Sequence, residues 1–329
     1  MTLRIADKWV WDFWFARRED EWHIFYLQAP RALGDPARRH HSASIGHAVS
    51  SDCRQWQVVA DAIQPGPPGS WDDLATWTGS VIEHEGRWFM MYTGISSVEA
   101  GLVQRIGLAT SDDLIHWSKY GANPVLESDA RWYETLDPRR WRDQSWRDPY
   151  VFVHPDDGRF HVLITSRSPV GPSDGAGVIA HARSDDLINW EVLSPITQPG
   201  EFAQVEVPQL IIGGDGCKIV FSCHSEDHSN ERVRRIGARG AGGTFVLSAK
   251  DLYGPFTASD TPVAASNDAL GVLYAGKVID RGVGEFEFMA FHGDSDVDFV
   301  GELTDPLPIK QTSDGGFEIV VDPKIDLAI

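Results

Sequence analysis

The chain lacks three features that would place it in other classes of protein. It has only 3 cysteines in 329 residues, at irregular spacing, which argues against a disulfide framework and favours buried free thiols. It has no run of about 18 apolar residues, so it offers no transmembrane helix. Its first residues, 1–8, show no basic stretch followed by an apolar one, so we expect no signal peptide and a cytoplasmic location.

The chain is also poor in positive charge. Its 29 Lys and Arg residues face 48 Asp and Glu residues, which gives a formal net charge of -19. A surface this acidic repels nucleic acids and anionic membranes. We therefore expect neither as a partner and favour a small neutral or cationic substrate.

Helical periodicity is nearly absent, whereas short apolar and aromatic-rich runs recur between turn residues. This pattern is typical of β-strands. The runs are Trp22–Leu27, Trp88–Tyr92, Phe160–Ile164, Lys218–Phe221 and Phe286–Phe291.

A repeat of roughly 60 to 70 residues organises these strands. Its marker is a Ser-Asp turn that ends in an aromatic residue. The copies are Ser51–Trp56, Ser111–Trp117, Ser184–Trp190 and, more loosely, Ser248–Phe256. We interpret these Asp and Trp residues as architecture: the Asp bonds the backbone of its own turn and the Trp packs between repeats.

A unit of this length with four short strands is a propeller blade. The sequence therefore predicts an all-β, five-bladed β-propeller that occupies 1–329 as a single domain, without a C-terminal β-sandwich. The expected blades are 5–60, 70–122, 144–195, 200–258 and 268–320.

Acidic residues stand at the start of three predicted blades. Asp12 lies among the indoles of Trp9–Trp14, Asp148 lies in Trp146–Tyr150, and Glu206 lies in Gln204–Leu210. Strand alternation predicts Trp11 on one face and Asp12 on the other. Because the first strand of each blade lines the axis, we expect the three acids to converge on one funnel.

Converging carboxyl groups without a metal suit the cleavage of a glycosidic bond. One acid with a raised pKa protonates the leaving oxygen, and another attacks the anomeric carbon or activates water. The third can hold sugar hydroxyls. Trp residues nearby offer flat apolar faces on which a sugar can stack.

These motifs resemble those of the invertase–levansucrase superfamily, glycoside hydrolase families 32 and 68. The resemblance rests on Val-Trp-Asp at Asp12, Arg-Asp-Pro at 147–149 and Glu-Val-Pro at Glu206. Two further stretches are similar to family motifs, 25–30 ending after Gln28, and Trp77-Thr-Gly-Ser80 followed by Tyr-Thr-Gly at 92–94. The motifs occur in the family's order over most of the chain.

The resemblance implies a retaining double displacement on a small β-fructofuranoside, by hydrolysis or fructosyl transfer and without a cofactor or metal. Asp12 would be the nucleophile, Glu206 the acid and then the base, and Asp148 the residue that grips ring hydroxyls. The two working carboxyl groups would stand about 5–5.5 Å apart. The implied substrate contacts are Trp11, Gln28, Trp77, Ser80, Arg147 and Tyr274.

Two other functions remain open on the sequence. One is an inverting arabinofuranosidase or xylosidase on the same propeller, with carboxyl groups about 6.5–9.5 Å apart. The other is a sugar-binding propeller without catalysis. The oligomeric state, monomer or homo-oligomer, is also open.

The segment 131–146, before the third blade, is rich in Arg, Asp and Trp and lacks strand alternation. We interpret it as an insertion. It is either a packed surface loop without a function, or a functional element, namely a lid or wall over the funnel or a subunit contact.

Overall fold

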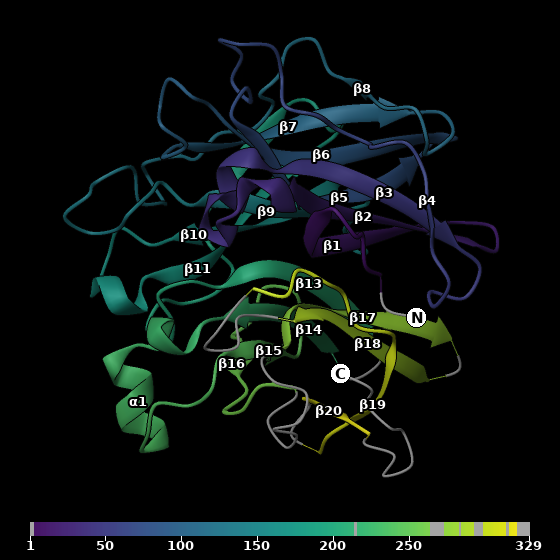
Figure 1. Cartoon of the computed structure of the whole chain (residues 1–329). Coiled ribbons are helices and arrows are strands. Elements are labelled where there is room, and N and C mark those ends of the chain that lie inside the picture. The colour runs from purple at the N-terminus through teal and green to yellow at the C-terminus, as the bar shows by residue number, and fades with distance from the viewer. Residues whose placement is uncertain are drawn as a thin grey trace.

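The computed structural model describes residues 3–213, 216–263, 273–282, 284–292, 299–313 and 316–320. Within these residues, twenty strands form five antiparallel sheets of four strands, each in chain order (Figure 1). The all-β class and the five-bladed propeller are thereby confirmed, and the described residues hold no C-terminal β-sandwich. That 1–329 forms a single domain stays a prediction.

The strand bounds follow the predicted blades closely. Blade one is β1 (Lys8–Arg18), β2 (Glu21–Pro30), β3 (Ser44–Ser50) and β4 (Gln57–Val58). Blade two is β5 (Ala75–His84), β6 (Arg87–Ile95), β7 (Gln104–Ser111) and β8 (Ser118–Lys119). Blade three is β9 (Trp146–Val153), β10 (Phe160–Arg167), β11 (Gly177–Ser184) and β12 (Trp190–Leu193). Blade four is β13 (Glu206–Gly213), β14 (Gly216–Cys223), β15 (Gly243–Ala249) and β16 (Thr257–Ala258). Blade five is β17 (Leu273–Gly282), β18 (Glu285–His292), β19 (Leu307–Gln311) and β20 (Phe317–Ile319).

Helical structure is confined to short connections. The described residues contain one α-helix, α1 (Asn230–Ile236), and four 3-10 turns, η1 (Arg31–Leu33), η2 (Pro36–Ser42), η3 (Ser173–Gly175) and η4 (Ser225–Asp227). Within the described part of the chain, no helix is long and apolar enough to cross a bilayer.

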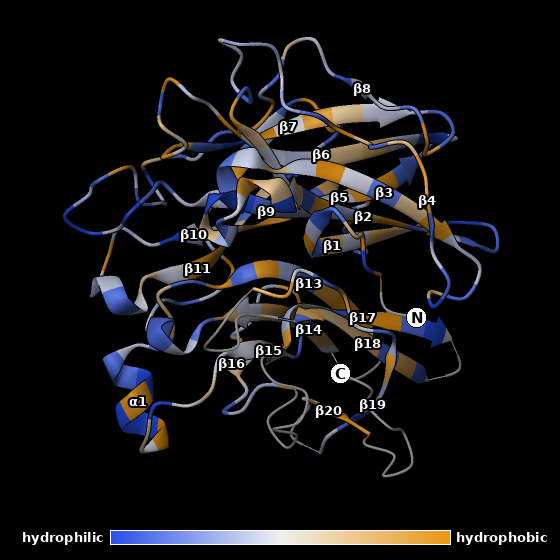
Figure 2. Cartoon of the chain, viewed as in Figure 1, coloured by the Kyte–Doolittle hydropathy of each residue, from blue (hydrophilic) through white to orange (hydrophobic). Residues whose placement is uncertain are grey.

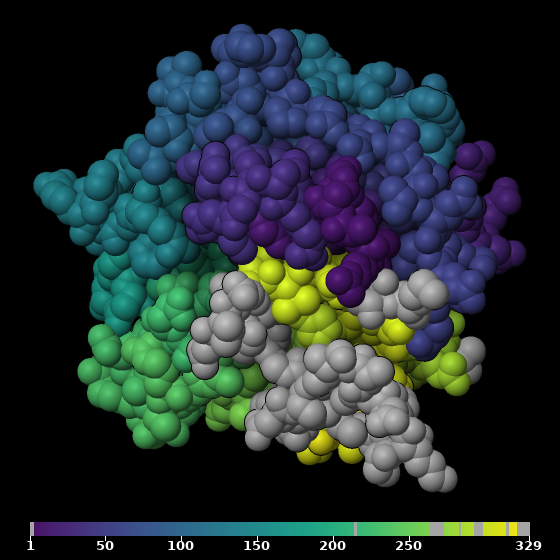
Figure 3. Space-filling view, in the orientation of Figure 1, coloured from purple at the N-terminus to yellow at the C-terminus, as the bar shows by residue number. Residues whose placement is uncertain are grey.

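The first strands of the blades surround the axis, and the ring closes between blades five and one. β1 contacts both β5 and β17. The N–H of Val10 donates to the carbonyl of Gly301 at 2.9 Å, and Arg31 donates to the carbonyl of Val300 at 2.9 Å. Figure 3 shows the purple N-terminal segment against the yellow C-terminal segment on this face.

Apolar side chains pack between neighbouring blades. Figure 2 shows hydrophobic residues as orange bands along the strands. A large buried cluster joins residues of blades one, two and five, including Trp9, Phe25 and Met289. Trp117, from the turn of blade two, lies edge-on against Phe25 of blade one at 5.6 Å. Trp117 therefore packs between blades, as predicted for the repeated Trp, whereas Trp56 stacks on Phe15 of its own blade.

The repeated turn joins the third strand to the fourth, and its Asp bonds backbone amides of the same turn. Oδ1 of Asp113 accepts from the N–H groups of residues 115 and 116 at 2.9 and 2.8 Å. Asp52 and Asp186 do the same. In the three copies, the serine whose hydroxyl donates to the turn Asp is Ser50, Ser111 or Ser184. The first copy of the turn therefore begins at residue 50, one residue earlier than the sequence repeat suggests.

Candidate active site

A β-bulge interrupts each of the five first strands near the axis. The pairing shifts between Trp11 and Phe13, Trp77 and Gly79, Arg147 and Tyr150, Glu206 and Gln209, and Tyr274 and Lys277. Four bulges place a non-glycine residue at positive φ: Asp12 (29°), Asp148 (59°), Val207 (49°) and Ala275 (50°). A bulge re-aims the side chains beside it and is frequent next to active sites.

The bulge corrects the prediction that Trp11 and Asp12 point to opposite faces. Both line the same cavity, because the extra residue in β1 breaks the two-residue alternation. Trp9 and Trp14 are buried in the core instead.

The cavity at the axis has a volume of about 370 Å³ and brings together the three predicted acids. Trp11, Trp77, Arg147 and Tyr274 also line it, as the sequence led us to expect. The cavity is also lined by residues outside the predicted set of site residues: Arg39, His40, Thr78, Gln104, Arg142, Asp143 and His224. Thr78 lies within the Trp77–Ser80 motif, for which the resemblance implies Trp77 and Ser80 as the sugar contacts.

Gln28 and Ser80, two predicted sugar contacts, are not among the residues that line this cavity, and their contact with a sugar stays a prediction. The amide of Gln28 accepts from Nζ of Lys8 at 2.9 Å and donates to Ser44 at 3.3 Å, so it ties strands of blade one together. Oγ of Ser80 accepts from the N–H of Val151 at 2.9 Å, which links blade two to blade three. Ser80 lies along a second, smaller cavity of about 130 Å³.

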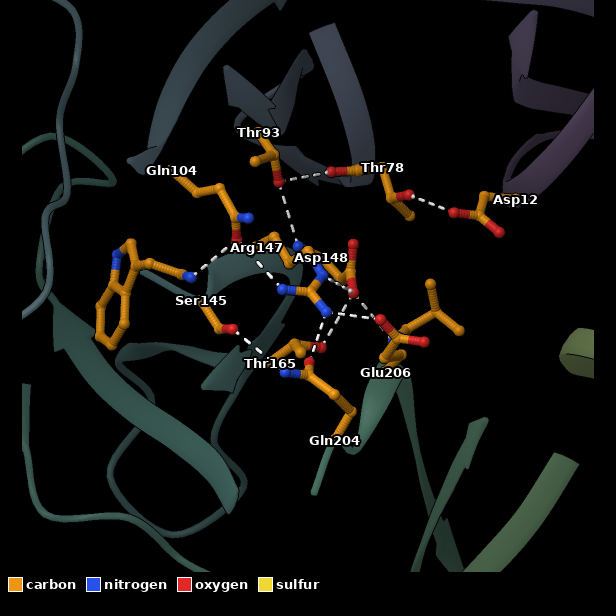
Figure 4. A network of polar contacts seen from close by, with 12 residues as sticks. Asp12, Thr78, Thr93, Gln104, Ser145, Arg147, Asp148, Thr165, Gln204 and Glu206 are labelled. Atoms are coloured by element: carbon orange, nitrogen blue, oxygen red, sulfur yellow. Dashed lines mark hydrogen bonds and ion pairs between the residues drawn. The ribbon is translucent and has the colours of Figure 1, made fainter. Parts of the chain in front are cut away.

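Asp12 is held from the neighbouring blade. Oγ1 of Thr78 donates to Oδ2 of Asp12 at 3.0 Å (Figure 4). Burial, together with the negative charges of Asp148 and Glu206, raises the pKa of Asp12 to about 7. Gly79 allows this geometry, because a Cβ there would collide with the carbonyl oxygen of Met91.

Asp148 is buried, with 5% of its surface exposed, and its carboxylate is fixed by two donors. The hydroxyl of Thr165 donates to Oδ2 at 2.9 Å, and the N–H of Val207 donates to the same oxygen at 3.1 Å. Its own N–H donates to Thr93 at 3.0 Å. Burial raises the pKa of Asp148 even though Arg147 opposes the shift.

Arg147 connects the remaining groups. Its Nη2 lies 2.5 Å from Oε1 of Glu206 and also donates to the side-chain oxygen of Gln204, while Nη1 donates to that of Gln104 at 3.2 Å (Figure 4). The hydroxyl of Tyr274 donates to Oε2 of Glu206 at 2.5 Å. Both oxygens of Glu206 therefore have a donor, and the Arg147 ion pair is charge-assisted.

These contacts give Glu206 the opposite shift from Asp12. Burial alone would raise the pKa of Glu206, but the positive charge of Arg147, aided by His224 and Tyr274, lowers it to about 2. An acid catalyst needs a raised pKa, so the lowered pKa of Glu206 differs from what its implied role as the acid led us to expect, whereas burial raises the pKa of both Asp12 and Asp148.

Lys277 is buried on β17, with 5% of its surface exposed. Its Nζ donates to the carbonyl of Val207 at 2.6 Å. The N–H of Val207 in turn donates to Asp148, so the lysine and the acid both bind the backbone of Val207. Burial lowers the pKa of Lys277 to about 8, while Asp148 and Asp12 act in the opposite direction.

The segment 131–146 contributes Arg142 and Asp143 to the cavity lining. Of its two interpretations, a wall over the funnel therefore describes the structure better than a surface loop alone. Asp143 lies 3.8 Å from Arg147.

Histidines near the site do not form a metal centre. His224 stacks on Tyr274 with 4.3 Å between ring centroids, whereas His228 is buried against Phe202 and Phe245. Among the described residues, no group of three or more His, Cys, Asp or Glu side chains is arranged to hold a metal ion.

A five-bladed propeller with three carboxyl groups at bulges around one axial cavity defines the class of the invertase–levansucrase superfamily. Residues 14–234 match the model of the Glycosyl hydrolases family 32 N-terminal domain, and the chain belongs to this family. The match includes Asp148 and Glu206 and begins two residues after Asp12.

Individual relatives are distant. The chain is 27% identical over 231 residues to the beta-fructofuranosidase insoluble isoenzyme 6 of Oryza sativa, and the alignment covers 69% of this chain and 34% of the rice protein. It is 24% identical over 353 residues to the extracellular sucrase of Zymomonas mobilis, and that alignment covers 91% of this chain and 78% of the sucrase. The chain thus spans about a third of the first relative's length and most of the second's.

Among solved structures, the chain is similar to the inulosucrase from Halalkalicoccus jeotgali bound to kestose. The TM-score is 0.78 at 21% identity, covering 95% of this chain and 87% of the other. At this identity the likeness establishes the fold alone.

Proposed function

We propose that this chain cleaves the β-fructofuranosidic bond of small saccharides with retention of configuration, with fructosyl transfer to a second sugar as the competing outcome. The observation that carries the proposal is the convergence of Asp12, Asp148 and Glu206 on one cavity from three separate blades. Relatives named as fructofuranosidases and sucrases support the choice of sugar.

In the proposed mechanism, Asp12 attacks the anomeric carbon of the fructosyl unit and forms a glycosyl ester. Glu206 protonates the leaving oxygen and then removes a proton from the incoming water or sugar hydroxyl. Asp148, held rigidly by Thr165 and Val207, accepts hydrogen bonds from ring hydroxyls. These bonds strengthen as positive charge develops on the ring.

The reaction requires a proton on Glu206 and a charge on Asp12. At a pH between the pKa of Glu206 and that of Asp12, the two carboxyl groups together hold one proton. This proton can occupy either group. We propose that the bound sugar displaces Tyr274 or Arg147 from Glu206 far enough to move the proton there. The reactive form of the pair is then the less populated one, in which Glu206 holds the proton and Asp12 is charged.

The sugar-stacking role falls mainly to Trp77. Trp11 is only 1% exposed, and His40 and Phe299 lie edge-on against it. Trp77 is half-buried at the cavity, and its Nε1 donates to the carbonyl of His40 at 2.7 Å, which fixes the ring. A cavity of about 370 Å³ suits a short saccharide.

The test is the Asp12→Asn variant with sucrose as substrate. We expect loss of turnover by at least about 10³-fold, since the nucleophile is gone. The variant should stay folded with a Tm at pH 8 no lower than that of the wild type, because a buried negative charge has been removed. Unchanged turnover would contradict the proposal.

Proton NMR of the first-formed fructose separates the mechanisms. Retention gives the β-anomer first, and the α-anomer would favour the inverting alternative. A wild-type protein that binds sucrose or kestose without turnover would instead favour the sugar-binding alternative. Turnover of arabinofuranosides alone would contradict the fructoside assignment.

The cellular location and the oligomeric state stay predictions. Cell fractionation tests the first and light scattering tests the second.

A further inference from the structure

Arg167 is a fully buried cation at the end of β10, outside the catalytic cavity. Only 1% of its surface is exposed. A buried guanidinium must be satisfied by charge and by hydrogen bonds, because its desolvation is costly. Where its donors point therefore shows which parts of the fold it holds together.

The partners of Arg167 come from three different segments. Its Nε lies 3.2 Å from Oε1 of Glu134, and its guanidinium lies 3.9 Å from the ring centroid of Trp141, both in the wall segment 131–146. Nη2 donates to the carbonyl and the hydroxyl of Ser173 at 2.9 and 2.7 Å. Nη1 donates to the carbonyl of Ala203 at 2.5 Å, three residues before Glu206.

The wall is closed around this cation by a second set of contacts. Glu134, itself 6% exposed, also binds Nε of Arg140 at 2.7 Å. The hydroxyl of Ser173 donates to the carbonyl of Arg140. The start and the middle of the wall are thus both anchored through Arg167 and Glu134.

The far end of the wall stands beside the proposed acid. Ser145 donates to Asp143 at 2.7 Å, and the amide of Gln204 donates to Ser145 at 3.2 Å. Arg142 and Asp143 line the cavity on this side. Because Glu206 protonates the leaving oxygen in the proposed mechanism, the leaving group departs along the side that the wall encloses.

We propose that Arg167 is a positioning residue that holds the wall segment 131–146 in place and so determines how well the site accepts the leaving group. The inference rests on the proposed function. Arg167 touches no part of the cavity itself; it acts through Glu134 and Trp141 on the position of Arg142 and Asp143.

The kinetic test compares two substrates with the same fructosyl unit and different leaving groups, sucrose and methyl β-D-fructofuranoside. For Arg167→Met we expect kcat/KM with sucrose to fall about 10- to 100-fold, because a displaced wall no longer holds the leaving group in place. With the methyl glycoside, whose leaving group is too small to reach the wall, the loss should stay below about 3-fold. An equal loss on both substrates would overturn the proposal.

Two further variants provide the controls. Arg183→Met removes a half-buried arginine of the same blade, paired with Glu191 at 2.8 Å, and should leave the turnover of both substrates unchanged. Glu134→Gln keeps the shape of the glutamate but removes the charge that pairs with Arg167. It should reproduce the loss of kcat/KM that is selective for sucrose. If Arg167→Met does not fold, Glu134→Gln and Arg167→Lys carry the same comparison.

Hydrogen–deuterium exchange provides a readout that is independent of activity. In Arg167→Met, exchange should quicken in residues 131–145 of the wall, while the amides of β9–β12 keep their protection. Exchange that quickens throughout blade three, or in no segment, would overturn the proposal. If the wild type turns over neither fructoside, the proposed function fails, whereas the exchange experiment still decides whether Arg167 anchors the wall.

Discussion

Arg147 of blade three and Glu206 of blade four form an ion pair with 2.5 Å between Nη2 and Oε1. This pair helps to lower the pKa of Glu206, while burial raises the pKa of Asp12 and of Asp148, whose Oδ2 lies 3.7 Å from Nε of Arg147. The direct bond from Arg147 therefore sets Glu206 apart from the other two acids.

The first prediction concerns the pH dependence of turnover. The carboxyl pair keeps its single proton below the pKa of Asp12, about 7, and loses it above. We expect kcat/KM for sucrose to fall about tenfold per pH unit as the pH rises past about 7, because the acid catalyst is then missing. Initial rates between pH 5 and 9 give the profile, and a kcat/KM that increases through pH 7 would contradict it.

The second prediction concerns Lys277. Its positive charge lowers the pKa of Asp12, so its removal should raise that pKa further. In Lys277→Met we expect the falling limb of the pH profile to move to higher pH, with a larger change in kcat than in KM. Lys218→Met, which removes a lysine from β14 in blade four, is the control. A limb that does not move would show that Lys277 serves only to bind Val207.

The third prediction separates Thr78 from Ser80. Thr78→Val removes the bond to Asp12 at 3.0 Å, and kcat/KM should fall about 10- to 100-fold, the value of a hydrogen bond to a charged group. Ser80→Ala leaves the N–H of Val151 unpaired, so it should cost about 1–3 kcal/mol of unfolding free energy. Its kcat/KM should change little. A greater catalytic loss in Ser80→Ala would favour Ser80 as a sugar contact.

The fourth prediction concerns acid stability. Blades one and three carry a buried histidine pair at equivalent positions: Nδ1 of His23 lies 3.0 Å from Nε2 of His47, and Nδ1 of His161 lies 2.7 Å from Nε2 of His181. Burial lowers the pKa of all four, to about 3 for His47 and His181.

Because these folded-state pKa values lie below the unfolded value of about 6.5, the unfolded chain takes up protons first as the pH falls. The free energy of unfolding should therefore decrease from about pH 6.5 downward, by up to about 1.4 kcal/mol per pH unit for each neutral histidine. Urea titrations at several pH values measure the slope. His181→Gln should reduce it and the more exposed His84→Gln should not; equal slopes in all three proteins would contradict the assignment.

The sequence determined the architecture because each blade is a local unit. Strand-forming runs and the Asp of each turn act within about 60 residues, so the repeat predicted five blades and their bounds. It also placed Asp12, Asp148 and Glu206 on first strands, which surround the axis in any propeller.

Only the tertiary structure decided which side chains enter the cavity and how they are charged. A bulge adds one residue and reverses the alternation after it, so Asp12 joined Trp11 whereas Ser80 turned to Val151. The pKa order depends on contacts between blades, such as Arg147 with Glu206, 59 residues apart. Strand periodicity carries no information on such contacts, because packing between blades sets them.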